Sequence, residues 1–458
     1  MVNTVLSNTA TSKRTARLRW AASCIGAALA LGASPAGAIG LREAYEAALR
    51  NDPAFRMHFY ENEAAKENRI MGRASLLPQV GASYNASRVR ADLTITAGGV
   101  ERAPTYPRYI SRGANIQLRQ PLVNFEALAR FKQTIATTNE SQARFEANTT
   151  ELALRVMGAY TDVLFAADQL ELVKAQRTTY TEQMKVNNRL FEKGEGTKTD
   201  MLEIQARLDL SEAQVLEGED NLRANRTTLE GLIGMDPGVL DPLIPDFKFD
   251  KDKPASFDEW RALALEHNDE LRSARFTIEA AKQEINKARA GHAPRLDFVA
   301  SYGRSDSETI TTVDQNQLNR SIGIQLNIPL YQGGYVNAAS RQAVAGLERA
   351  KANLDAKTNA VTLELRKAHN LVVSSVAKVQ ALVKATESGT LLTKATEQSV
   401  RGGVRINLDL LNAEQQLAQS KRDLQQARYS YLLGVLRLRA AAGMLSGDDL
   451  REVAAYFR

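Results

Sequence analysis

Two stretches of the chain, 125–192 and 335–401, contain no proline and are each roughly 67 residues long. An uninterrupted α-helix of that length would extend about 100 Å, because each residue adds about 1.5 Å. Ordinary globular helices are about 11 residues long, so these two would dominate any fold that contained them. Apolar residues in the first stretch recur mostly at steps of three and four. They form a narrow stripe typical of helix-to-helix packing: Leu152, Val156, Tyr160, Val163, Leu170 and Val173.

The sequence also repeats itself once, with a period of about 210 residues. Four pairs of segments resemble each other in the same order along the chain. They are 41–53 with 260–271, 74–84 with 290–302, 115–125 with 323–334, and 194–202 with 403–411. One such pair could arise by chance, but four in a single order indicate an internal duplication.

Each half predicts the same succession of elements: two short helices, a β-hairpin, a long helix, a glycine-containing turn and a second long helix. On this basis we divide the chain into a signal peptide at 1–38, a first repeat at 39–245, a connector at 246–256, a second repeat at 257–445 and a C-terminal tail at 446–458. The expected helices are 41–51, 54–76, 125–192, 199–231, 258–268, 270–291, 335–401 and 407–443, and the hairpins lie at about 80–120 and 295–330.

Apolar and polar residues alternate in the two predicted hairpins, as in strands whose two faces meet different surroundings. After Arg88 the alternation slips, which predicts a bulge or a departure from the membrane. A half-buried soluble sheet also alternates, but we favour transmembrane strands with one face toward lipid. The lipid-facing residues would include Tyr84, Ile116, Leu118, Phe298, Tyr302, Ile324, Leu326 and Ile328.

Four strands per chain cannot close a barrel. Two chains would supply eight strands, which a barrel fills with its own side chains, whereas three chains supply twelve and enclose a lumen. Three chains also bring twelve helical columns if the short helices stack on the ends of the second long helices. We therefore predict an α+β membrane protein. It would be a homotrimer in which a long α-helical barrel continues into a twelve-stranded β-barrel surrounded by outer-membrane lipid.

The first 38 residues have the order of a secretory signal peptide. A basic segment precedes an apolar segment at 20–32, and Ala36-Gly37-Ala38 forms a cleavage site.

The formal net charge of +6 comes largely from residues 1–38. Four of the 59 basic residues lie there, and the remaining 55 are nearly balanced by 53 acidic residues. A nucleic-acid binder usually has a basic face, so we expect no nucleic-acid partner. Cys24, the only cysteine, lies inside the apolar segment, so we expect no lipid anchor, disulfide or zinc-thiolate site.

Patterns that carry catalysis do not occur in the sequence. The four histidines form no HExxH pattern, and neither a P-loop nor a G-x-S-x-G elbow is present. Beyond residue 38 no run of 18 apolar residues could form a transmembrane helix. We expect no enzymatic activity, no cofactor and no metal, and any membrane insertion would use strands.

Together these features resemble the TolC family of outer-membrane factors. The resemblance rests on QPLVNF and IPLYQGG at the strand-to-helix joins and on DML at 200–202 and DLLNA at 409–413, and it covers roughly 41–445. LREAYEAALRNDP and ASLLPQV are most similar to the branch that serves type I secretion. The resemblance implies a trimeric exit duct in the outer membrane, with most of its mass in the periplasm. Such a duct docks on a periplasmic adaptor and an inner-membrane pump, which supplies the energy.

In that family, polar residues at the turns of the helical hairpins hold the periplasmic end closed. An arginine facing carboxylates there could latch the tube through charge-assisted hydrogen bonds. Asn412 stands where some members carry a second aspartate, so the expected gate bears less negative charge, and Val400 stands where a tyrosine can join the latch. The alternative is that these are ordinary solvated residues. The resemblance assigns the gate to Thr199, Asp200, Val400, Arg405, Asp409 and Asn412.

Glycines mark both expected hairpin turns. Gly194 and Gly196 lie in the first turn, and Gly402 and Gly403 lie in the second. Their simplest role is to supply turn conformations. A second role would be a surface that the tips of an adaptor can approach closely.

Three functions fit the sequence. We favour an exit duct for protein export by type I secretion. A duct of the same architecture for drug or metal efflux is the first alternative, because the partner pump determines the cargo. A periplasmic coiled-coil scaffold with a soluble sheet is the more distant alternative, and outer-membrane fractionation would separate it from the other two.

Overall fold

The computed structural model describes residues 39–457, except for 91, 93, 95, 102, 104–107, 195, 245–255 and 308–314. The predicted signal peptide lies outside the described residues, and so does all but the last residue of the predicted connector.

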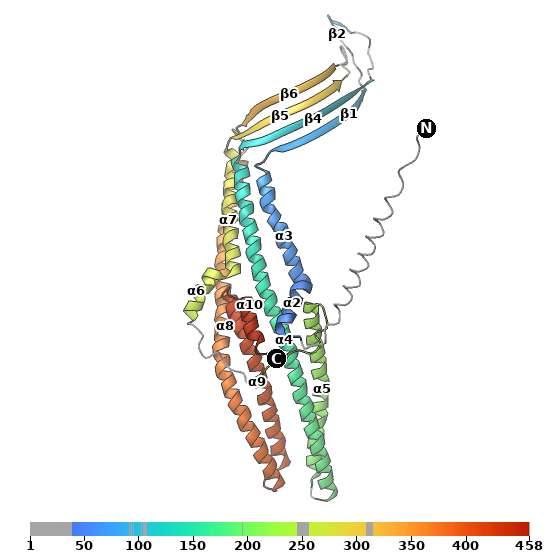
Figure 1. The fold of residues 1–458 in the computed structure, drawn as a ribbon, viewed down its shortest axis with the longest axis vertical. Helices are drawn as coiled ribbons and strands as arrows, with labels where there is room; N and C mark the ends of the chain where they lie inside the picture. The colour runs from blue at the N-terminus through green and yellow to red at the C-terminus, as the bar shows by residue number, and fades with distance from the viewer. Residues whose placement is uncertain are drawn as a thin grey trace, which may run out of the picture.

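The protomer is elongated, with a tilted sheet at one end and two helical hairpins at the other (Figure 1). We call these the sheet end and the tip end. The helices are α2 (Leu41–Asn51), α3 (Pro53–Ala74), α4 (Phe125–Glu192), α5 (Lys198–Ile233), α6 (Phe257–His267), α7 (Asp269–Arg289), α8 (Tyr335–Arg401), α9 (Asn407–Ala441) and α10 (Gly447–Ala454). The strands are β1 (Gln79–Arg90), β2 (Thr96–Ala97), β3 (Val100–Glu101), β4 (Arg108–Val123), β5 (Arg295–Ser307) and β6 (Gln315–Asn327), and a 3-10 turn, η1, spans Ala290–His292.

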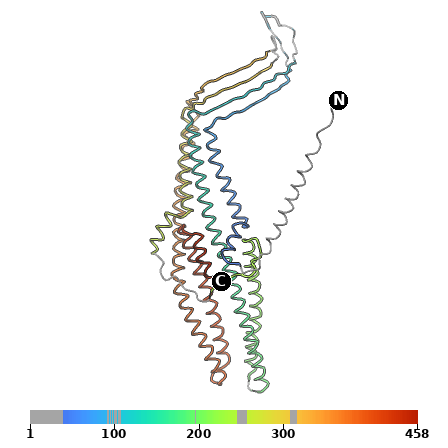
Figure 2. The backbone as a smooth tube through the Cα atoms, in the orientation of Figure 1, coloured from blue at the N-terminus to red at the C-terminus, as the bar shows by residue number. Residues whose placement is uncertain are grey.

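Helices α4 and α8 run without a break from the sheet end to the tip end (Figure 2). Their bounds are those expected from the two proline-free stretches, and the other predicted helices lie within two residues of their expected bounds. Helix α4 begins where the side chain of Asn124 accepts a hydrogen bond from the Ala127 amide, at 3.0 Å. Helix α8 begins after Gly334, which has a left-handed φ of 82°.

The shorter helices meet end to end halfway along the molecule. The Asn51 side-chain amide donates to the carbonyl oxygen of Ile233 at the end of α5, at 2.6 Å. The Asn268 side-chain amide donates to the carbonyl oxygen of Ala441 at the end of α9, at 3.0 Å. Helix ends expose carbonyls without partners, and each asparagine satisfies one of them. Asn268 also caps the start of α7, whereas Asp52, the residue after Asn51, caps the start of α3. Thus α5 meets α2 and α3, and α9 meets α7, which produces the stacking expected for helical columns.

The main core lies at this midpoint, under α2 and α10. Tyr160 of α4 is fully buried, and its hydroxyl donates to the Ile39 carbonyl oxygen at 3.0 Å and accepts from the Asp241 amide at 3.1 Å. The ring of Phe457 packs against the Tyr160 ring, with 5.5 Å between centroids. The chain after 445, expected as a tail, therefore contains a packed helix. A capping box between Ser446 and Asp449 begins α10.

The main sheet has the order β1-β4-β5-β6 and is antiparallel throughout. Its β1–β4 register is continuous as far as the pair Arg90 and Arg108, so the bulge predicted after Arg88 is wrong. The register shifts instead in β4, between Pro121 and Val123, because proline cannot donate to a neighbouring strand.

We expect Gly443→Ala to destabilise the midpoint junction strongly. Gly443 has a φ of +71°, and an added Cβ would lie 2.4 Å from the His267 carbonyl oxygen, which is backbone. Backbone strain and overpacking together predict a loss of about 3 kcal/mol. Gly403→Ala is the matched control, because Gly403 has a φ of +73° but open space around it, and strain alone predicts about 1 kcal/mol. Thermal unfolding followed by far-UV circular dichroism would measure both, and equal losses would contradict the steric argument.

Candidate functional site

The strand register divides the sheet into an apolar face and a polar face. Val80, Leu118, Ala300 and Ile322 are paired across the four strands, so they lie on one face. The adjacent set of paired residues, which includes Gln117, Ser301 and Ser321, lies on the other face of the sheet. Seven of the predicted lipid-facing residues share the apolar face: Tyr84, Ile116, Leu118, Phe298, Tyr302, Ile324 and Leu326.

The eighth predicted lipid-facing residue, Ile328, lies one residue beyond the end of β6. It is 52% exposed, but it belongs to the connection toward α8 and not to a strand. Pro329 follows it directly, and a proline has no N–H to donate to a neighbouring strand. The expectation that Ile328 is a strand residue is therefore wrong.

The polar face is cross-linked near the helices. Asp297 of β5 is buried, and its carboxylate accepts from Arg119 of β4 at 2.6 Å and pairs with Arg295 at 3.0 Å. Farther along, the hydroxyls of Ser301 and Ser321 are 2.7 Å apart. Among the described strand residues, β1 and β6 each pair on one side only. These two strands run in opposite directions, so β6 of one copy could pair antiparallel with β1 of another.

A polar groove runs over α4 on the side away from α2 and α10. Gly158 and Asp162 line it, and each is two residues from the core residue Tyr160. Two residues turn a helix by about 200°, so the groove and the core lie on opposite sides of α4.

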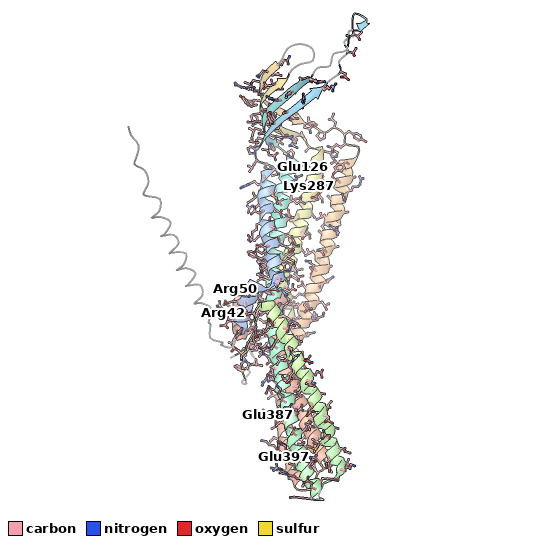
Figure 3. All side chains as sticks on the ribbon, turned by 90° about the vertical axis from the view of Figure 1, so that its right-hand side faces the viewer. Arg42, Arg50, Glu126, Lys287, Glu387 and Glu397 are labelled. Carbon is pink, nitrogen blue, oxygen red and sulfur yellow. The ribbon has the colours of Figure 1, made fainter. Side chains whose placement is uncertain are left out.

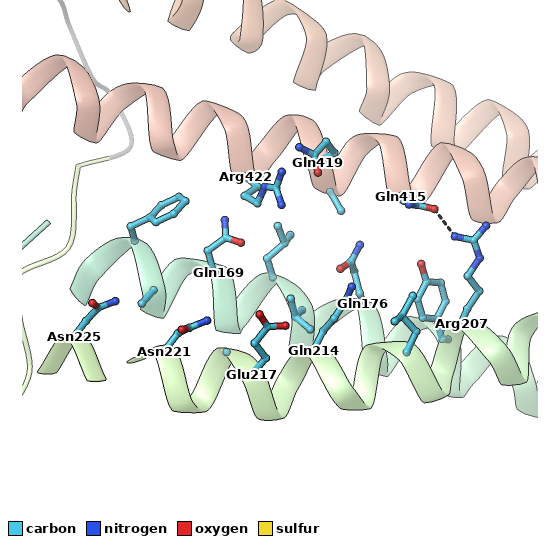
Figure 4. Close-up of a pocket in the computed structure, with 18 residues that line it drawn as sticks. Gln169, Gln176, Arg207, Gln214, Glu217, Asn221, Asn225, Gln415, Gln419 and Arg422 are labelled. Carbon is cyan, nitrogen blue, oxygen red and sulfur yellow. Dashed lines mark hydrogen bonds between the residues drawn. The ribbon is translucent and has the colours of Figure 1, made fainter. Parts of the chain in front are cut away.

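Toward the tip end, the groove encloses about 450 Å³ between α4, α5 and α9 (Figure 4). Its lining is rich in carboxamides, with Arg207 and Arg422 from the flanking helices. The carboxamide residues are Gln169, Gln176, Gln214, Asn221, Asn225, Gln415 and Gln419. Nearer the midpoint the same side of α4 borders a wider hollow of about 1270 Å³.

Both hairpin turns lie at the tip end of the molecule (Figure 1). The predicted gate residue Asp200 belongs to the cap of α5: its amide donates to the Thr197 hydroxyl at 3.1 Å, and its carboxylate accepts from that hydroxyl at 2.7 Å. Thr199 follows Thr197 in the first turn of α5. No described ion pair joins Arg405 to Asp200 or Asp409 within the protomer. Arg405 lies in an exposed turn.

The contacts between the two hairpins lie farther from the turns than expected. The Arg207 guanidinium of α5 donates to the Gln415 side chain and, at 3.2 Å, to Asn412 of α9. Gln183 of α4 donates to the Glu414 carboxylate of α9 at 2.9 Å. Among the predicted gate residues, Asn412 is the one that takes part in this link. Sequence reasoning missed Arg207, which is two turns beyond Asp200 and has no motif of its own.

Two of the four predicted turn glycines adopt left-handed backbone. Gly194 has a φ of 78° and Gly403 has a φ of 73°, a region that other residues rarely adopt. Gly402 has a φ of −82° as the cap of α8, and its amide donates to the Gln398 carbonyl oxygen. An added Cβ at Gly196 would lie 3.0 Å from the Phe191 amide nitrogen. The Val400 carbonyl oxygen accepts from the Gly403 amide at 3.0 Å, so the backbone of Val400 helps to close the second turn.

Burial between the hairpins changes the ionisation of two carboxyls. Burial raises the pKa of Glu414, the hydrogen bond from Gln183 opposes this rise, and the Glu397 carboxylate adds to it. Glu397 lies toward the tip end of α8 (Figure 3). Burial likewise raises the pKa of Asp168, although the Tyr429 hydroxyl donates to it at 2.8 Å and opposes the rise.

Among the described residues, no helix is both long enough and apolar enough to cross a membrane, and no group of three or more potential ligands could hold a metal ion. An apolar sheet face with two edges unpaired within the protomer, continuous with helical hairpins that carry a polar groove, is typical of one subunit of a membrane β-barrel that extends into helices.

Comparison with known proteins identifies the family. The profile of the outer membrane efflux protein family matches residues 44–235 and 260–444. The chain belongs to this family, and it is an outer-membrane protein.

The alkaline protease secretion protein AprF of Pseudomonas aeruginosa is 42% identical over 94% of this chain and 90% of its own length. The proteases secretion protein PrtF of Dickeya chrysanthemi is 38% identical, with 94% of each chain covered. The outer membrane channel CmeC of Campylobacter jejuni superposes with a TM-score of 0.77 at 16% identity, over 91% of this chain and 90% of that one. The predicted TolC-like fold and the predicted outer-membrane location are confirmed.

We expect Glu414→Gln to stabilise the protein near neutral pH. A carboxyl whose pKa rises on folding makes the folded state bind more protons than the unfolded state, so stability increases as the pH falls through that pKa. The variant should therefore melt above the wild type at about pH 7.5 and lose this advantage toward about pH 4. Glu212→Gln, on the exposed side of α5, is the control and should have no effect. A Glu414→Gln advantage that is independent of pH would contradict this account.

Proposed function

We propose that the protein is a trimeric outer-membrane exit duct that serves protein export by type I secretion. The observation that carries this function is the continuity between the sheet and the grooved helices. Because α4 follows β4 after a single residue and α8 follows β6 after the connection at 328–334, a barrel closed by three sheets would open into a helical tube. A tube built on helices of this length would reach deep into the periplasm, by about 100 Å.

The proposed partners are two further copies of the chain, a periplasmic adaptor and an inner-membrane pump. The free edges of β1 and β6 support the first, because an unpaired strand edge is a template for another strand. The second hairpin turn supports the adaptor, since Val404 is 82% exposed and Ile406 is 63% exposed. These two neighbouring apolar side chains would be covered by a partner that contacts the turn. We propose no enzymatic activity for this chain, and the pump would supply the energy.

Protein cargo is supported by the relatives AprF and PrtF, both named for protease secretion. The test is export in a strain that lacks its own outer-membrane duct. The chain would be expressed with a type I pump, its adaptor and their protease substrate, and extracellular protease would be measured. We expect secretion to depend on this chain, and protease retained inside cells with all components assembled would contradict the proposal.

Efflux of small molecules is the second candidate, because the family and one relative, BepC of Brucella suis, are named for efflux. Restored drug resistance without restored protease secretion, in cells that supply both kinds of pump, would favour efflux.

We expect the loss of the Arg207 contacts to open the tip end. Arg207→Ala with Gln415→Ala removes the hydrogen bonds between α5 and α9, each worth about 1.5–3 kcal/mol when one partner is charged. Single-channel current in a planar bilayer should increase relative to the wild type. Arg422→Ala is the control, because Arg422 lines the same groove but its ion pair is with the neighbouring Asp423 of its own helix.

The originally predicted latch is tested in the same assay by Asp200→Ala with Arg405→Ala. An increase in this variant alone would place the gate at contacts between chains at the turns. An increase in the Arg207 variant alone would place it at the link between α5 and α9.

A further inference from the structure

Six arginines lie on the apolar face of the sheet, in the half of each strand farthest from the helices. The strand register places them there. Arg88 pairs with Ile110 and Arg90 pairs with Arg108, on the same face as Tyr84. Arg112, Arg304 and Arg320 continue the band across β4, β5 and β6, because they alternate in step with Ile116, Tyr302 and Ile324. We call these six residues the arginine band: Arg88, Arg90, Arg108, Arg112, Arg304 and Arg320.

The band is confined to one face. At the same level the polar face carries Ser87, Tyr109, Ser111, Ser305 and Gln317, and no arginine. The remaining arginines of the described main-sheet strands, Arg119 and Arg295, lie on the polar face at the opposite end. Both are paired there with Asp297. A general preference for arginine at strand ends would populate both faces, so this segregation indicates a requirement of the apolar face.

The positive charge of the band is poorly compensated within the protomer. Among the described residues, no ion pair joins a carboxylate to the four arginines of β1 and β4, and all four are exposed. Asp306, which lies opposite Arg112 in the register, is the one carboxylate facing them on the described strands. Arg304 is 3.5 Å from Asp306, and Arg320 lies over the ring of Tyr302 at 5.6 Å. Arg90 and Arg108 are directly opposite each other, which is unfavourable for like charges. A bridging anion would remove this repulsion.

The position of the band identifies the anion. Between the band and the helices the same face is apolar, from Leu118 to Ala114 on β4 and from Leu296 to Tyr302 on β5. In a membrane this apolar zone would meet the hydrocarbon, so the arginines would lie at the level of the headgroups in the outer leaflet. Guanidinium groups bind phosphate oxygens in a bidentate manner.

We propose that the arginine band binds the phosphorylated headgroups of outer-leaflet lipid. The proposal rests on the proposed function, since it requires the sheet to span the outer membrane. The apolar face would then contact one lipid molecule in two places. The apolar zone between the arginine band and the helices packs against the acyl chains, and the arginine band neutralises the phosphates. A trimer would present three such bands around its circumference.

The test is lipid binding by the full-length mature trimer in detergent, measured by native mass spectrometry. The probes are bisphosphorylated lipid A and the same lipid after removal of its phosphates. We expect the wild type to prefer the phosphorylated lipid. Arg90→Gln with Arg108→Gln should weaken that binding by about tenfold or more, because it removes charge-assisted hydrogen bonds, and Arg90→Lys with Arg108→Lys should weaken it less.

Arg56→Gln with Arg261→Gln is the matched control. It removes the same charge from two exposed arginines, on α3 and α6, that have no described ion pair, and lipid binding should not change. Equal binding of the two lipids by the wild type, or full affinity in the Arg90 and Arg108 glutamine variant, would overturn the proposal. Complete competition by inorganic phosphate at equal concentration would overturn it too, because it would indicate a free-anion site.

Trimer mass and single-channel current in the same samples separate this proposal from the proposed function. Weakened lipid binding with unchanged current would support the band in a working duct. Unchanged lipid binding with normal current would overturn the band and leave the duct intact.

Discussion

The architecture depends on how helix ends are satisfied at the middle of the molecule. Helices α4 and α8 run the whole distance without interruption, but every other helix is too short to accompany them. Two shorter helices must therefore meet end to end along each long one, and their exposed backbone groups need partners there. Asn51 and Asn268 provide them by bonding the last carbonyls of α5 and α9. Because α2 and α10 then cover these junctions with apolar side chains, the thickest part of the core lies where the helices change.

The functional surfaces follow from strict alternation in the strands and from helical periodicity in α4. Alternation separates an apolar face with its arginine band from a polar face, within a sheet only one layer thick. Periodicity places the core residue Tyr160 and the groove residues Gly158 and Asp162 on opposite sides of one helix. One chain thus presents surfaces suited to lipid, to water and to its neighbours without dividing these tasks among separate domains.

Local sequence patterns predicted the helices and strands well, but they could not predict side-chain contacts between residues far apart in the chain. The missing prolines identified α4 and α8, and the alternation identified the strands. The slip after Arg88 was a real signal, but the bulge, one of its two predicted explanations, was wrong, because the register continues and arginines interrupt the apolar pattern. The link from Arg207 to Asn412 joins residues 205 positions apart, and no local pattern encodes such a meeting. Helix α10 was missed because a segment of eight residues is too short to indicate a stable helix by itself, and its support comes from tertiary packing, in which Leu450 and Val453 are buried.

The unequal construction of the helical columns has a mechanical consequence. A continuous hydrogen-bonded helix is stiff along its length, so α4 and α8 act as beams that join the strands to the tips. The columns beside them are jointed, since only side-chain amides and packing connect α9 to α7 and α5 to α2. Bending of the tip segments can therefore be absorbed at the joints, while the beams keep the strand ends in place. The construction of the protomer therefore gives its two ends different mechanical properties, with a compliant tip and a rigid connection to the strands.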